Sequence, residues 1–166
     1  MNKIRFCKLK ENATIPSKEK YNAGYDIYAC FDEDYIEIPP HTTKLVGTGI
    51  ASVIPTNYYM HICERGSTGS KGIKSSAGVI DSSYRGEWFM AVTNSNDIPL
   101  VIAKKDVELD FFCDVNEIII YPYEKALFQA IVHSVHNELE VEEISVNNLD
   151  NYKSERGCGK LGSSGK

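Results

Sequence analysis

The stretch GVIDSSYRGEW, residues 78–88, begins with an apolar run that ends in a carboxylate, Asp81. Two serines follow, and Tyr84, Arg85 and Trp88 then lie close together in the chain. An apolar run bounded by turn residues predicts a strand that leads into a hairpin. Asp81 would therefore lie where a packed core meets solvent, which is a suitable position for a general base.

Short segments of the same kind recur along the chain, with Pro, Gly, Asn and Asp between them. They are GYDIYAC, YIEIPP, TKLVGTGIASVI, YYMHIC, WFMAVTNSN, PLVIAKKDVELDFF, NEIIIYP and LFQAIVHSV. The segment EKALFQAIV, residues 124–132, fits a helix and a strand equally well by its periodicity, and we predict a strand. The fold class predicted from these segments is all-β, a sandwich or barrel.

Composition limits the class of protein. The 166 residues fit one domain, and 42% hydrophobic with 25% charged residues is typical of a globular protein. No apolar run approaches the roughly 20 residues of a membrane span, and the N-terminal segment does not resemble a signal peptide, so we expect a cytoplasmic protein without a membrane partner. The five cysteines show no metal-binding spacing and are expected to be reduced thiols. The net charge of -5 argues against a nucleic-acid partner.

Local positive charge is found beside glycine, in ERGSTGSKGIK (64–74), YRGE (84–87) and SERGCGKLGSSGK (154–166). Glycine next to Arg or Lys favours phosphate binding, because bare backbone N–H groups can approach the anion while the side chain adds charge. Each stretch alone is also compatible with an ordinary loop. The last one has too little apolar content to fold alone, so we expect a β domain over residues 1–153 and a mobile arm over residues 154–166. The four histidines are scattered, and we assign them no chemistry.

Five short motifs, taken in chain order, resemble those of the trimeric dUTPases. The first is AGYDIYA (23–29), the second RGSTGSKG (65–72), the third GVIDSSYRGE (78–87), the fourth ALFQA (126–130) and the fifth RGCGKLGSSG (156–165). The third is the closest match, and the five together cover nearly the whole chain. The resemblance implies a distorted β-barrel or jelly-roll-like fold, a homotrimer whose sites are shared between subunits, and a divergent member of phage or viral type.

The resemblance also implies an activity, the hydrolysis of dUTP to dUMP and pyrophosphate with Mg²⁺ as cofactor. In it Asp81 is the catalytic base, and Asp26 supports the metal through water. Uracil and deoxyribose would contact Gly78, Val79, Ile80, Tyr84 and Leu161. The phosphates would contact Arg65, Gly66, Ser67, Gln129, Arg156, Gly162 and Ser163.

Several positions depart from the family pattern. Glu64 and Gly66 stand where the second motif has Pro and Ser, which is expected to remove one hydroxyl contact and to add a negative charge beside the site. Ala126 stands in place of an arginine in the fourth motif, and Leu161 in place of the aromatic residue that stacks on uracil. The span from Trp88 to Gln129 is longer than usual, which predicts an insertion.

Two alternatives stay open from the sequence. One is a dCTP deaminase-like enzyme of the same broad fold, although we find no second acid placed to activate water at the base. The other is a non-catalytic nucleotide-binding regulatory protein, which the altered second, fourth and fifth motifs suggest.

Overall fold

The computed structural model describes residues 3–107, 117–149 and 151–154 of the chain. Strands dominate this part, which confirms the all-β prediction, and its two helices, α1 (Gly66–Gly69) and α2 (Val146–Leu149), are single turns. The strands are β1 (Arg5–Lys8), β2 (Gly24–Ile27), β3 (Tyr35–Ile38), β4 (Thr43–Gly47), β5 (Ile50–Val53), β6 (Tyr58–Glu64), β7 (Ile73–Ser75), β8 (Val79–Ile80), β9 (Phe89–Asn94), β10 (Leu100–Ala103), β11 (Ile119–Pro122) and β12 (Phe128–Ser134). Among the described residues, no helix is long and apolar enough to cross a membrane.

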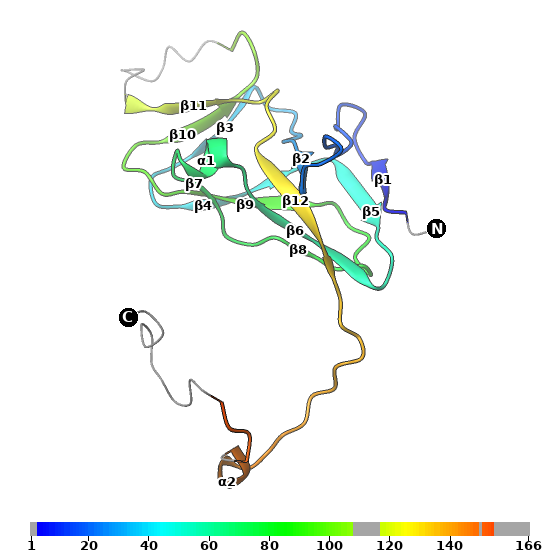
Figure 1. Ribbon diagram of the computed structural model, residues 1–166. Helices are drawn as coiled ribbons and strands as arrows, with labels where there is room; N and C mark the ends of the chain where they lie inside the picture. The colour runs from blue at the N-terminus through cyan, green and yellow to red at the C-terminus, as the bar shows by residue number, and fades with distance from the viewer. Residues whose placement is uncertain (1–2, 108–116, 150, 155–166) are drawn as a thin grey trace. The chain divides into compact units, whose positions relative to one another are not determined.

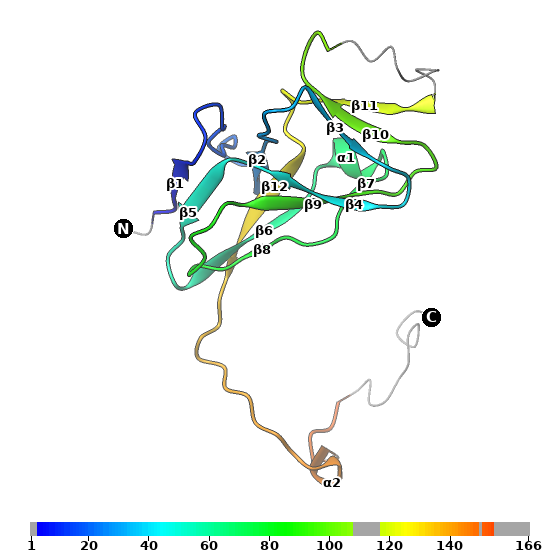
Figure 2. The ribbon, with the colours of Figure 1, turned by 180° about the vertical axis from the view of Figure 1, so that it is seen from behind.

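The chain divides after Val135 into two units. In the first unit the strands form four small sheets, with the orders β1-β5, β11-β10-β3, β2-β12-β6-β8 and β4-β9-β7 (Figures 1 and 2). Nearly all pairings are antiparallel; β10 and β11 pair in parallel. The segment that joins β10 and β11 includes residues 108–116, so the predicted insertion lies partly outside the described residues. In the second unit, α2 is the single regular element described.

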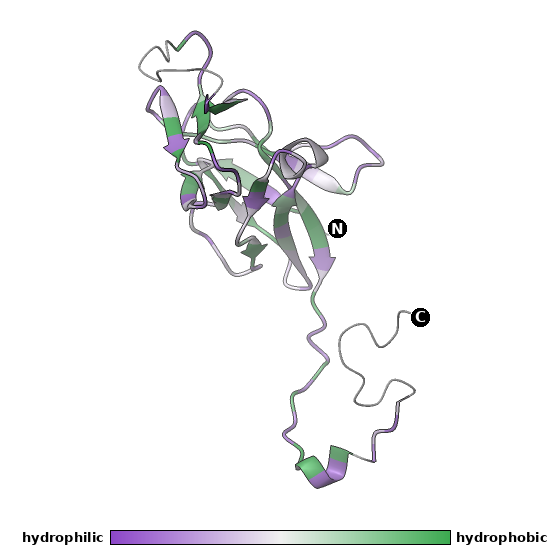
Figure 3. Ribbon diagram, turned by 90° about the vertical axis from the view of Figure 1, so that its left-hand side faces the viewer, coloured by the Kyte–Doolittle hydropathy of each residue, from purple (hydrophilic) through white to green (hydrophobic). Residues whose placement is uncertain are grey.

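All four sheets share one hydrophobic core. Figure 3 shows the hydrophobic residues gathered along the strands of the first unit. The core includes Phe128 and Met60 from one sheet, Ile38 from a second and Met90 from a third, each with no exposed surface. Phe6 of the β1-β5 sheet packs edge-on against the buried Trp88. Such a common interior is what a barrel or sandwich requires.

The strand β12 places the candidate site. Its side chains alternate, with Phe128 and Ala130 buried and Gln129 half-buried on the other face. β12 lies between β2 and β6, so that Gln129 is opposite Asp26 on one side and Cys63 on the other. The prediction of a strand here is confirmed, because the burial follows a period of two rather than the helical period.

The hairpin predicted at residues 78–88 is not formed. β8 pairs with β6, whereas β9 pairs with β4 and β7, so the stretch leaves one sheet and enters another. The Trp88 main chain bonds to residues 48 and 50, and its indole donates to the Ser52 hydroxyl at 3.2 Å. The buried Trp88, with its N–H satisfied, therefore fixes the end of the stretch in the β4–β5 region, away from β8.

Candidate functional site

A single helical turn fixes the backbone of Arg65. Arg65 follows β6 directly and caps α1, and its backbone N–H donates to the Thr68 hydroxyl at 3.1 Å. The same hydroxyl donates to the Arg65 carbonyl at 3.1 Å, and Thr68 has no exposed surface. This reciprocal bond holds the start of the RGSTGSKG loop. The sequence marked the loop by its glycines, and it gave no indication that Thr68 is buried beneath it.

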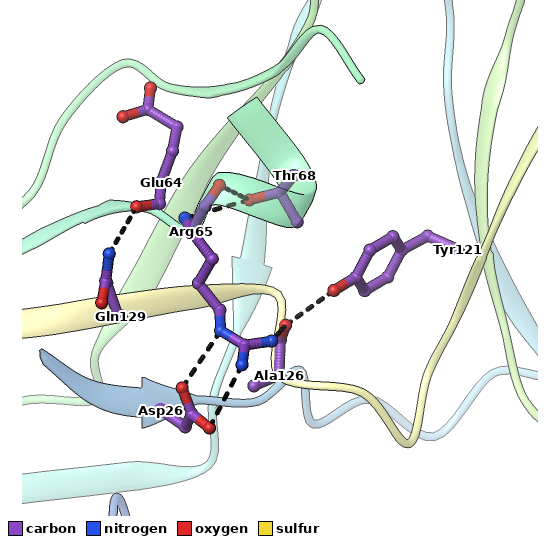
Figure 4. Close-up of polar contacts among 7 residues, drawn as sticks. All are labelled: Asp26, Glu64, Arg65, Thr68, Tyr121, Ala126 and Gln129. Carbon is purple, nitrogen blue, oxygen red and sulfur yellow. Dashed lines mark hydrogen bonds and ion pairs between the residues drawn. The ribbon is translucent and has the colours of Figure 1, made fainter. Parts of the chain in front are cut away.

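The Arg65 guanidinium is held from two directions (Figure 4). Its Nε lies 3.1 Å from Asp26 Oδ1, and its Nη2 lies 3.5 Å from Asp26 Oδ2. Its Nη1 donates to the backbone carbonyl of Ala126 at 3.0 Å. About a third of each side chain in the Arg65–Asp26 pair is exposed, so the pair faces solvent and can meet a ligand.

Gln129 lies on the same face, with its amide Nε2 donating to the Glu64 carbonyl at 2.8 Å. Its side chain lies against Gly24 so closely that a Cβ on Gly24 would come within 2.2 Å of Gln129 Oε1. The glycine of the AGYDIYA motif is therefore required to make room for Gln129. Neither contact is local in sequence, and both depend on β12 lying between β2 and β6.

These groups line one polar cavity of about 510 Å³. Its lining residues are Tyr21, Asn22, Ala23, Gly24, Asp26, Arg65, Gly66, Ser67 and Gln129. A cavity of this size accommodates a small ligand. The Asp26 carboxylate in the lining is paired with Arg65, and the remaining N–H groups of Arg65, the glycine-rich turn and an amide suit an anion. The structure thus brings together the candidate residues of the first, second and fourth motifs.

The carboxylate of Glu64 does not join this cluster. It accepts a hydrogen bond from the Ser75 backbone N–H at 2.8 Å, and Figure 4 shows the side chain directed away from Asp26 and Arg65. The Ser75 N–H bond lowers the pKa of Glu64, against a smaller opposing effect of burial. The negative charge of Glu64 therefore binds the backbone of β7 and does not face the cavity.

Replacement of Glu64 by Gln should lower the free energy of unfolding by at most about 1 kcal/mol at neutral pH, since a partly exposed charged bond is lost. Because the folded-state pKa of Glu64 is lowered, its contribution is complete above its ordinary value of 4.5 and is lost as the pH falls through the folded-state value. Urea denaturation at pH 7 and at about pH 3 should show the two proteins converging at acid pH. If the difference in unfolding free energy between the two proteins were the same at both pH values, the stabilising role of the charged Glu64 side chain would be contradicted.

The Asp81 region is separate from the cavity. Ile80 is 7% exposed, whereas Asp81 is exposed, so the carboxylate does lie where the core meets solvent. The Tyr84 N–H donates to the Asp81 carbonyl at 3.1 Å and closes a tight turn. The Tyr84 hydroxyl donates to the Glu87 carbonyl at 2.9 Å, and the residue is 43% exposed.

Asp81 and Arg65 lie far apart within one chain. Ile80 pairs with Met60, which places Asp81 level with Tyr59, at the opposite end of β6 from Arg65. At roughly 3.3 Å per strand residue, the offset is about 20 Å. β8 and β2 also form opposite edges of the four-stranded sheet. A single chain therefore does not bring the candidate base to the cavity.

The remaining predicted residues, Arg156, Leu161, Gly162 and Ser163, lie outside the described residues. Within the described part, no group of three or more His, Cys, Asp or Glu side chains is arranged to hold a metal ion. The three cysteines described, Cys7, Cys30 and Cys63, are free thiols.

A family model and related sequences indicate the same family for this chain. The family model for dUTPase matches residues 10–107. The deoxyuridine 5'-triphosphate nucleotidohydrolase of Candida albicans is 32% identical over 154 residues, which cover 92% of this chain and 81% of that protein. The protein of the same name from Leptospira interrogans is 38% identical over 104 residues, which cover 60% of this chain and 71% of its own.

Solved structures show the same fold. A point mutant of the dUTPase of Staphylococcus bacteriophage 80alpha, in a complex with dUpNHpp, gives a TM-score of 0.75 with 23% identity, and both chains are covered in full. A point mutant of the dUTPase of phage phi11 of S. aureus, described with a structural Mg(II) ion, gives a TM-score of 0.68 with 21% identity over 89% of this chain and 99% of its own. The matched family model and the relatives of similar length together show that this chain belongs to the dUTPase family.

Proposed function

We propose that this protein hydrolyses dUTP to dUMP and pyrophosphate, which limits dUTP available for incorporation into DNA and supplies dUMP. The observation that carries the proposal is the Arg65 guanidinium, which is held by Asp26 and Ala126 and lines a polar cavity. Membership of the dUTPase family supports it, since the relatives are named for this reaction. The dUTP triphosphate carries the negative charge that suits this cavity, and the nucleotide is long enough to reach from it to a catalytic base on another part of the site.

The site is proposed to form between copies of the chain, in a homotrimer. About 20 Å separates Asp81 from Arg65 within one chain, which is too far for both to act on the same phosphate group. A second copy can supply Asp81 to the first copy's cavity, and a closed ring with threefold symmetry forms three such sites from one repeated contact.

Uracil is proposed to bind along β8. Among the described strands, β8 is an edge strand with a neighbour on one side, β6. Gly78 bonds to β6 through its carbonyl, so by strand alternation the free side presents the backbone N–H and C=O of Val79, between Gly78 and Ile80. These groups can match the edge of uracil and leave cytosine facing reversed partners. The exposed ring of Tyr84 would pack on the deoxyribose and exclude a 2′-hydroxyl.

In the proposed reaction, the Asp81 carboxylate accepts a proton from a water molecule as that water attacks the α-phosphorus in line. The bond from this phosphorus to the bridging oxygen breaks, and pyrophosphate leaves. Arg65, Gln129 and the N–H groups of Gly66 and Ser67 stabilise the charge on the phosphate oxygens.

Mg²⁺ fits this cavity. Asp26 offers a hard carboxylate oxygen beside the proposed phosphate position, and Mg²⁺ is commonly bound through one or two carboxylates, water and substrate phosphates. Asp26, already paired with Arg65, would hold the ion through water. The bound ion supplies neutralisation of charge on the phosphate oxygens.

Residues 154–166 are proposed to close over the nucleotide as an arm, with Arg156, Gly162 and Ser163 at the phosphates and Leu161 over the base. A chain ending at Lys153 should keep its oligomeric state and lose activity by at least about tenfold, because it loses groups that complete the site. Gel filtration and steady-state kinetics on the truncated protein test this. Full activity without these residues would show that they have no catalytic part.

The activity is tested by incubating the purified protein with Mg²⁺ and dUTP, dCTP or UTP while pyrophosphate and ammonia release are followed. Pyrophosphate from dUTP alone is the expected result. Ammonia from dCTP would indicate a deaminase, and no product from any of the three would indicate a binding protein. The free thiols described above suit a reducing compartment, and we propose a cytoplasmic location.

A further inference from the structure

Tyr121 contributes a hydroxyl to the back of the Arg65 cluster. It lies on β11, is 3% exposed, and belongs to the main hydrophobic core. Its hydroxyl donates to the Ala126 carbonyl at 2.7 Å, and the same carbonyl accepts the bond from Arg65 Nη1 (Figure 4). A carbonyl oxygen has two lone pairs, so these two donors satisfy it fully.

The contacts of Arg65 leave a defined part of its guanidinium free. Of its five N–H groups, one on Nε and one on Nη2 face Asp26, and one on Nη1 faces Ala126. The two that remain, one on each terminal nitrogen, form a fork of the kind that binds phosphate through two parallel hydrogen bonds. The direction of this fork depends on the three contacts that hold the rest of the group.

The Ala126 contact is needed to fix that direction. Asp26 and Arg65 are both partly exposed, and the second of their two contacts is long at 3.5 Å, so the pair alone holds the guanidinium weakly. The bond to Ala126 adds a third contact from a backbone that is itself tied down, since the next residue's N–H donates to the Ile27 carbonyl at 2.9 Å. Tyr121 orients this carbonyl through a short bond from a buried, rigid ring.

We propose that Tyr121 is a positioning residue for phosphate binding, which acts by holding the Ala126 carbonyl and, through it, the Arg65 fork. The proposal rests on the proposed function, because it takes the ligand of the fork to be the triphosphate of dUTP. Burial raises the pKa of the Tyr121 phenol from its ordinary value of 10, with nearby Arg65 and Ser67 opposing the shift, so the group is a protonated donor at neutral pH with or without the shift. Nothing local in the sequence marks this residue, since its hydroxyl interacts with a backbone atom five positions away and with the side chains of Arg65 and Ser67 in the second motif.

Tyr121→Phe removes the hydroxyl and keeps the ring. We expect KM for dUTP, and Kd for a non-hydrolysable dUTP analogue, to rise about fivefold to tenfold, with kcat changed less than about twofold. Tyr123→Phe is the matched control. That ring packs against Phe31 with centroids 4.8 Å apart, away from Arg65, so its KM and Kd should equal those of the wild type. Tyr121→Met also removes the hydroxyl and serves the same comparison if the first variant does not fold.

A double-mutant cycle shows whether Tyr121 acts through Arg65. Arg65→Lys keeps the charge and lacks the Nη1 group that donates to the Ala126 carbonyl. Adding Tyr121→Phe to this variant should therefore weaken analogue binding less than about twofold. The proposal would be overturned if Tyr121→Phe raised Kd by the same factor in the wild type and in Arg65→Lys. An unchanged Kd in Tyr121→Phe would also overturn it. Analogue binding requires no turnover, so a wild type that binds the analogue and does not hydrolyse dUTP would contradict the proposed function alone.

Discussion

Asp81→Asn should reduce kcat for dUTP hydrolysis by about 10³-fold and leave the affinity for a non-hydrolysable dUTP analogue within about twofold of the wild type. The reason is that the amide keeps the size and the hydrogen-bonding shape of the side chain and cannot accept the proton of the attacking water. The exposed Asp81 carboxylate, next to the buried Ile80, makes no side-chain hydrogen bond or ion pair within the described part of the chain, so stability should be unchanged. Single-turnover kinetics and calorimetric titration measure the two effects separately.

Asp97→Asn is the matched control. Asp97 is also an exposed aspartate in a turn, and its partner is His41 at 2.9 Å, outside the proposed site. This variant should hydrolyse dUTP at the wild-type rate. Near-normal turnover in Asp81→Asn would remove Asp81 from the mechanism.

Gly78→Ala should abolish nearly all activity, by about 10²-fold or more, and lower the free energy of unfolding by about 2 kcal/mol. A Cβ at Gly78 would lie 2.1 Å from the backbone oxygen of Ile62. That is closer than any side chain can approach, and the neighbour is backbone, which cannot turn aside. The Ile62 N–H also donates to the Gly78 carbonyl at 2.8 Å, so β8 would have to move away from β6. Asp81 would move with it.

Gly69→Ala provides the comparison for this variant. Its added Cβ would meet Glu64 at 3.4 Å, an ordinary contact, so the alanine should leave both stability and activity close to the wild type. Chemical denaturation with parallel kinetics tests both glycine variants. Wild-type stability and activity in Gly78→Ala would show that β8 does not depend on close contact with β6.

The sequence was sufficient for the strand content and for the position of Asp81. Alternating burial along β12 and the apolar run before Asp81 are local patterns, and both were readable in advance. The hairpin was predicted wrongly because local turn signals do not reveal that Trp88 is anchored to Ser52, far away in the chain. Strand pairing of this kind is decided by packing that the sequence does not display.

The site was predicted as a set of residues shared between subunits, without the contacts that hold each side chain. Asp26, Arg65 and Gln129 were chosen by resemblance, and the structure places them at one cavity because β12 lies between β2 and β6. The direction of the Glu64 carboxylate was not foreseen, because its partner is a backbone N–H eleven residues away. Tyr121 was missed for the same reason. Every residue type has the same backbone N–H and C=O groups, so a hydrogen bond to the backbone cannot be predicted from the identity of the partner residue.

The central claim is that Asp81 of one copy acts on a substrate held by Arg65 of another, and mixing two inactive variants tests it most directly. Asp81→Asn and Arg65→Ala should each be nearly inactive alone. After co-refolding in equal amounts, about a quarter of the sites would combine an intact Asp81 with an intact Arg65, so activity should recover to about a quarter of the wild-type value. A mixture no more active than its two components would contradict the account.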